Sequence, residues 1–213
     1  MTPNVRNPEG ERNMRLIQFE DGGKREVAAI ADDVARVVVE AGSVYALARE
    51  AADSGRKLAD VVAARGLGRA VDAAALLAAG KVLSPIDHPD PAHLHVTGTG
   101  LTHLGSAATR DAMHKSTTEA AVETLTDSMK MFRMGLEGGK PKPGETGVQP
   151  EWFYKGNGNS VAAPGAAIAS PAFARDAGEE PEIAGIYIIG KDGNPYRIGF
   201  ALGNEFSDHV TER

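Results

Sequence analysis

The chain has 213 residues, of which 42% are hydrophobic and 24% are charged, and its formal net charge is −6. This composition is typical of a soluble globular protein and excludes a disordered chain or a coiled coil, while the acidic balance argues against a nucleic-acid partner. The chain has no cysteine. This excludes thiolate catalysis, disulfide bonds and cysteine-bound zinc, and it suits the reducing cytoplasm, where we expect the protein.

Residues 1–13 form a polar extension that we predict to be disordered. They lack the basic start and the apolar stretch of a signal peptide. No apolar run in the chain approaches the roughly 20 residues that span a bilayer, so we expect no membrane partner.

Residues 14–84 are predicted to form a small N-terminal α+β domain. A β-hairpin opens it, with its turn at the DGG sequence of positions 21–23, because glycine adopts the positive φ that such turns need. Alanine- and leucine-rich segments with helical spacing follow, with Ser43 as an N-cap and with Gly55 and Gly66 as helix ends. We interpret these segments as packing elements and identify no catalytic or binding motif in them.

Residues 85–213 are predicted to form a second, β-rich domain. We place the boundary near Pro85, because three prolines in GKVLSPIDHPDPAH indicate an extended linker. A short strand then runs into a glycine-rich loop, and a long helix is predicted over 106–135. The glycine- and proline-rich stretch that continues to 171 predicts irregular backbone with short strands.

A second hairpin closes the chain. Its arms, 183–189 and 196–202, flank Asp192-Gly193, which is a strong turn signal. Both arms are too apolar for a surface sheet, so we expect them to belong to a β-rich core.

Two glutamates at the start of this hairpin are the first candidates for chemistry. Glu180 and Glu182 are two residues apart, so a strand would place both on one face. They are either a solvated pair at the rim or ligands of Mg²⁺ or Mn²⁺, which prefer oxygen. A metal site needs a third ligand, and the returning arm offers Glu205 and Asp208 just past its end. The spacing alone does not choose between them.

His93 and His95 form an H-x-H pair on a predicted strand. Such a pair can bind zinc, but the chain offers no convincing set of further ligands, so we interpret both as ordinary strand histidines.

The glycine-rich segment 97–105 does not have the glycine spacing of a nucleotide-binding loop. We predict a tight turn whose amides and threonine hydroxyls hold a carboxylate. Lys155 follows three aromatic residues, and a lysine beside aromatic side chains can bind an anionic substrate. No G-x-S-x-G sequence supports a serine hydrolase.

Three segments, taken in order, resemble the fumarylacetoacetate hydrolase-like superfamily. They are EWFYKGNGNSVAAPGAAI, EEPEIAGIYIIGKDG and IGFALGNEFSDHVTER, and they lie in the second half of the chain. The segments HVTGTGLTHLGSAATRDAMH and GNEFSDHVTER are similar to those of one branch of the superfamily. The members of this branch resemble 2-keto-3-deoxy-sugar-acid dehydratases of sugar-acid (arabinose) catabolism.

The resemblance implies a mixed β-roll of the fumarylacetoacetate hydrolase type, a bound Mg²⁺ (or Mn²⁺) and a homodimer. It implies that Glu180, Glu182 and Glu205 are the metal ligands, with Glu205 in place of the aspartate that most of the superfamily has. Lys155 stands at the position of a substrate-contacting lysine. We therefore take Lys155 and His103 as catalytic candidates and predict four substrate-binding residues: Thr99, Gly100, Ser106 and Arg110.

The chain departs from the family pattern in two places. GLTHLGSAATR replaces the superfamily's N-Y-x-x-H-x-x-E motif, which argues against hydrolysis of a carbon–carbon bond. Family members also continue beyond the position of Arg213, so we expect the roll to be incomplete in this chain.

The resemblance implies a metal-dependent lyase. Its substrate would be a 2-keto-3-deoxy sugar acid, such as the arabonate, which loses water by enolisation. Two alternatives stay open: a hydrolase or decarboxylase of acylpyruvates, and a non-catalytic accessory protein of a sugar-utilisation operon.

Overall fold

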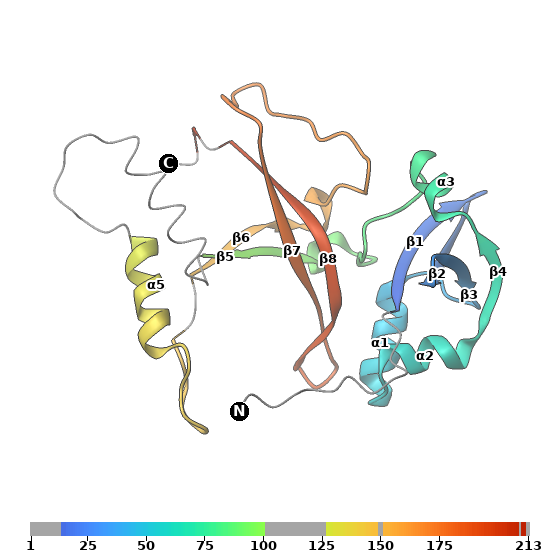
Figure 1. Cartoon of the computed structure of the whole chain (residues 1–213), viewed down its shortest axis with the longest axis horizontal. Coiled ribbons are helices and arrows are strands. Elements are labelled where there is room, and N and C mark those ends of the chain that lie inside the picture. The colour runs from blue at the N-terminus through green and yellow to red at the C-terminus, as the bar shows by residue number, and fades with distance from the viewer. Residues whose placement is uncertain (1–13, 101–126, 149–150, 209, 212–213) are drawn as a thin grey trace. The chain divides into compact units, whose positions relative to one another are not determined.

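A computed structural model of the chain (Figure 1) describes residues 14–100, 127–148, 151–208 and 210–211. The described strands form three antiparallel sheets, of four, two and two strands, and helices accompany them, so the fold is mixed α+β as predicted. No helix among these residues is long and apolar enough to cross a membrane. The β-roll and the boundary near Pro85 stay predictions.

The chain divides into two compact units. One runs to Pro89 and resumes at Val161, and the other is Asp90–Ser160. Each unit is described by itself.

The four-stranded sheet of the first unit begins with the predicted hairpin. Its strands, in order, are β1 (Arg15–Asp21), β2 (Lys24–Ala31), β3 (Val34–Val38) and β4 (Leu67–Val71). Gly22 and Gly23 have φ of 59° and 74°, the left-handed conformation that a two-residue turn requires. The hairpin is therefore confirmed, whereas β3 and β4 were not predicted.

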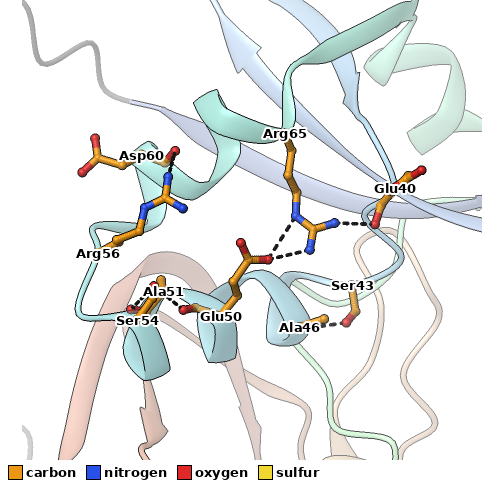
Figure 2. A network of polar contacts seen from close by, with 9 residues as sticks. All are labelled: Glu40, Ser43, Ala46, Glu50, Ala51, Ser54, Arg56, Asp60 and Arg65. Atoms are coloured by element: carbon orange, nitrogen blue, oxygen red, sulfur yellow. Dashed lines mark hydrogen bonds and ion pairs between the residues drawn. The ribbon is translucent and has the colours of Figure 1, made fainter.

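Three helices accompany this sheet: α1 (Val44–Ser54), α2 (Leu58–Arg65) and α3 (Ala73–Ala78). Ser43 caps α1 by accepting from the Ala46 amide, and Gly55 ends it at φ 66°, as predicted. Figure 2 shows Arg65 between Glu50 of α1 and Glu40, which lies in the turn after β3. Its guanidinium donates twice to Glu50 Oε2 and once, at 2.7 Å, to the Glu40 carbonyl.

Both faces of the four-stranded sheet are covered by apolar side chains. One buried cluster joins strand residues Val27 and Val38 to Leu47 of α1 and Val61 of α2. The other joins Phe19, Ala28, Ala35 and Val37 to Leu76 of α3 and to Val82. Burial on both faces explains why consecutive residues of β1, Gln18 and Phe19, are both fully buried.

The predicted linker begins as part of the first unit. Val82 forms an isolated β-bridge with Phe19, and the Leu83 amide donates to the Gln18 carbonyl at 2.9 Å. Arg25 donates to both carboxylate oxygens of Asp87 at 2.6 Å. The segment is extended, as its prolines predict, but it is anchored to β1 and β2.

The second unit contains a two-stranded sheet and one described α-helix. Its elements are η1 (Pro91–His93), β5 (His95–Thr99), α5 (Asp127–Gly138), β6 (Trp152–Asn157) and η2 (Gly158–Ser160). The first part of the helix predicted over 106–135 lies outside the described residues, and α5 matches its last part.

The closing hairpin belongs to the first unit and consists of β7 (Gly178–Ile189) and β8 (Pro195–Ser207). The predicted turn is present, since Gly193 has φ of 78° and the Asn194 amide donates to Asp192 Oδ1. Both strands are longer than predicted. Ile183 and Leu202 are 74% and 89% exposed, so the described residues do not enclose the hairpin in the β-rich core that its apolar arms predicted.

Candidate carboxylate site on the closing hairpin

The register of the closing hairpin brings the three predicted metal ligands to one face. Glu180 lies directly opposite Glu205, and Glu182 lies opposite Gly203. Residues that face each other across an antiparallel pair have Cβ atoms about 4.5–5.5 Å apart and point to the same side, as do residues two apart on one strand. Glu180, Glu182 and Glu205 therefore share a face, and Glu205 lies inside β8 and not past its end as predicted.

Small residues adjoin these carboxylates on the same face. Ala184 pairs with Ala201 beyond the Glu182–Gly203 pair. Neither methyl groups nor a glycine fill the space beside the glutamates. At the backbone, the Asn204 side chain accepts from the Glu180 amide at 3.1 Å, which adds a link between the strands beside the Glu180–Glu205 pair.

Asp208, the alternative third ligand, has a different role. It accepts from the amides of Arg175, Val210 and Thr211 and from the Thr211 hydroxyl. The Thr211 hydroxyl, followed by these amides, holds the pKa of the Asp208 carboxyl well below its usual range. These four donors already occupy the Asp208 carboxylate, which argues against Asp208 as a metal ligand.

The shared face offers carboxylate oxygens, which are the kind of ligand that a hard divalent cation binds. Carboxylate oxygens are the ligands that Mg²⁺ and Mn²⁺ prefer. Within the described ranges, however, no three histidine, aspartate or glutamate side chains gather into a group that could hold a metal ion. Glu182 and Glu205 are diagonal neighbours, about 7–8 Å apart at the backbone, so side-chain rotation is needed for the carboxylates to converge.

Lys155 lies in the second unit, where two glycines shape its surroundings. Its ammonium stacks 5.3 Å from the centre of the Phe153 ring. A Cβ on Gly98 would lie 2.9 Å from Lys155 Cε, and a Cβ on Gly100 would lie 2.8 Å from Glu151 Oε2. Glycine at both positions thus leaves room for the Lys155 and Glu151 side chains to lie against β5.

This arrangement corrects the first part of the tight turn predicted over 97–105, whose remaining residues, 101–105, lie outside the described residues. Thr97 and Thr99 are strand residues opposite Tyr154 and Trp152. The Gly100 amide donates to the Glu151 carbonyl at 2.9 Å. It therefore continues the ladder and is not available to hold a carboxylate. The glycines serve close packing rather than a turn, and the Thr99 side chain is exposed.

The H-x-H pair also differs from the prediction, because His93 and His95 do not share a strand. Asp90 caps η1, with Pro91 at its first position, so His93 ends a 3₁₀ turn and only His95 lies in β5. The His93 ring contacts Asp90 Oδ2 at 2.9 Å, and His95 packs edge-on against Tyr154. These partners agree with the interpretation as ordinary histidines.

The remaining site predictions divide between the units. His103, Ser106 and Arg110 lie outside the described residues. Lys155 belongs to the second unit and the carboxylates to the first. The sequence analysis missed Asn204 and the role of Asp208. Asp208 directly follows β8, and an aspartate at the end of a strand is a turn signal that could have suggested its role.

Comparison with known proteins gives no match: neither the family models, nor the curated proteins, nor the solved structures contain one significantly similar to this chain.

Replacing Gly100 by alanine is expected to destabilise the β5–β6 sheet by about 1–2 kcal/mol, because the new Cβ would lie 2.9 Å from Glu151 Cβ, which cannot move away without its backbone. The chain's single tryptophan, Trp152, lies in β6, so its fluorescence during urea unfolding reports on this sheet. Gly135 is the control in the same unit, since it lies in α5 and a Cβ added to it would have nothing within 4 Å. Gly135→Ala should not lower stability, because alanine is the better helix former by about 0.5–1 kcal/mol. Equal effects of the two variants would contradict the packing role of Gly100.

Proposed function

We propose that this chain binds Mg²⁺ or Mn²⁺ through Glu180, Glu182 and Glu205 and acts as a lyase that dehydrates a 2-keto-3-deoxy sugar acid, such as the arabonate. The observation that supports this most directly is the register of the hairpin, which places three carboxylates on one face. The resemblance of the surrounding segments to the fumarylacetoacetate hydrolase-like superfamily supplies the substrate class.

A divalent cation, when bound, supplies a Lewis acid for the carboxylate and ketone oxygens of a 2-keto acid. The chain's own part is to hold that positive charge with three anions and to leave small residues, Gly203 and Ala184, beside it. The overall reaction removes a proton from C3 and a hydroxide from C4, so that one water molecule leaves and the number of carbons is unchanged.

Lys155, in the second unit, carries a positive charge of the kind that binds an anion. Its stem crosses Gly98 and its ammonium lies against the Phe153 ring, which restricts the side chain before any ligand arrives. Such restriction reduces the conformational entropy that the side chain loses when it binds an anion. We assign no general base among the described residues.

Mass analysis of products tests the reaction. The full chain, with Mg²⁺, is incubated with 2-keto-3-deoxyarabonate, and we expect a product lighter by one water with its carbon count retained. Loss of carbon dioxide, or cleavage of an acylpyruvate, would instead favour a decarboxylase or hydrolase. No conversion of any of these acids would favour a non-catalytic accessory protein and overturn the proposal.

A further inference from the structure

The register of the closing hairpin places like charges opposite each other near its open end. Glu180 and Glu205 lie directly opposite each other, and like charges in that position destabilise a strand pair. The pair lies two positions from the end of the ladder, where Gly178 faces Ser207. A two-stranded hairpin is marginally stable by itself, so this end should fray first.

Asp208 links the two chain segments that meet at this end. It follows β8 directly, and its Oδ2 accepts from the amide of Arg175, three residues before β7, at 2.9 Å. The same oxygen accepts from the Thr211 hydroxyl, while Oδ1 accepts from the amides of Val210 and Thr211 at 3.1 and 3.3 Å. One carboxylate thus fixes the turn after β8 and ties it to the segment that leads into β7.

We propose that Asp208 is a positioning residue that closes the open end of the β7–β8 hairpin and thereby holds Glu180 and Glu205 opposite each other. The link to cation binding rests on the proposed function, whereas the closure itself does not. The hydrogen bonds that lower the pKa of Asp208 stabilise its charged form, which is consistent with this role.

The hairpin carries a matched control at its other end. Asp192, in the turn between the strands, accepts from the Asn194 amide and side chain and from the Tyr196 hydroxyl. Removing its carboxylate loosens the same hairpin with the same loss of charge, but far along the strands from the glutamates.

Hydrogen exchange on the full chain, measured by mass spectrometry, tests the closure. Asp208→Ala should accelerate exchange at least tenfold in peptides covering 178–182 and 203–207, whereas Asp192→Ala should accelerate it mainly near 188–197. Asp208→Asn keeps one acceptor oxygen and should have an intermediate effect. If Asp208→Ala does not fold, Thr211→Val, which removes one of the four donors, gives the same readout in milder form. Unchanged exchange at the open end in these variants would overturn the closure.

Manganese affinity, measured by the electron paramagnetic resonance of free Mn²⁺, tests the positioning. Residues that orient metal ligands typically change affinity by about 10–100-fold when mutated. We expect at least a tenfold loss in Asp208→Ala and no more than about a threefold change in Asp192→Ala. Equal affinities in wild type and Asp208→Ala would overturn the positioning role while leaving the proposed function standing. No Mn²⁺ binding by the wild type would contradict the proposed function, and hydrogen exchange would still decide the closure.

Discussion

Replacing Glu182 by glutamine in the full chain is expected to abolish measurable binding of Mg²⁺. The change removes one of three anions on the shared face and leaves an amide, whose oxygen is a much weaker ligand for a hard cation. It also removes the carboxylate that faces a glycine, Gly203, and so has the most open space opposite it. Isothermal titration calorimetry with Mg²⁺ measures the loss directly.

The neighbouring Glu179 provides a matched control for this prediction. It lies opposite Phe206, on the other face of the hairpin, and its side chain is exposed. Glu179→Gln makes the same change of charge three residues away along the chain, so a purely long-range electrostatic effect would weaken binding in both variants. We expect Glu179→Gln to retain Mg²⁺ affinity within about threefold, because surface charges at this distance are largely screened. Unchanged affinity in Glu182→Gln would contradict the ligand assignment.

The local elements of the first unit could be predicted well because short-range chemistry determines them. The glycines at 22 and 23 and the Ser43 cap each act within a few residues, and each is found where the sequence predicts it. The strands β3 and β4 were missed because they are five residues long and gain their stability from neighbours across the sheet. Their pairing depends on tertiary contacts, which the strand propensities of single residues do not predict.

The candidate site shows the same division. Placing Glu180 and Glu182 on one face needs only the period of a strand. The partner across the hairpin depends on register, and the bulge between Ile186 and Tyr187 shifts that register by one residue. Counting back from the Asp192-Gly193 turn would therefore give the wrong pairs. Likewise, the glycines at 98 and 100 suggested a turn, whereas their role is close approach to β6, which no local pattern reveals.

The largest loss of stability is expected from Gln18→Leu. Gln18 is fully buried in β1, and its amide donates to the Ser84 carbonyl at 2.7 Å and accepts from the Val44 amide at 3.0 Å. It thus joins β1 both to the start of α1 and to the extended segment after α3. Leucine has a similar volume but leaves two backbone groups without their partners, and each such buried group costs about 1–3 kcal/mol. We expect a total loss of about 2–4 kcal/mol in the free energy of unfolding.

Ser43→Ala is the control for Gln18→Leu, because it removes an ordinary capping hydrogen bond at the same end of α1. Ser43 accepts from the Ala46 amide at an exposed position, so its removal should cost only about 1 kcal/mol. Urea unfolding followed by far-ultraviolet circular dichroism measures both variants, and Trp152 fluorescence monitors the second unit in parallel. An equal or smaller loss in Gln18→Leu than in Ser43→Ala would show that Ser84 and Val44 find other partners. In that case the segment after α3 would be held by Val82 and by the Arg25–Asp87 ion pair, and not by Gln18.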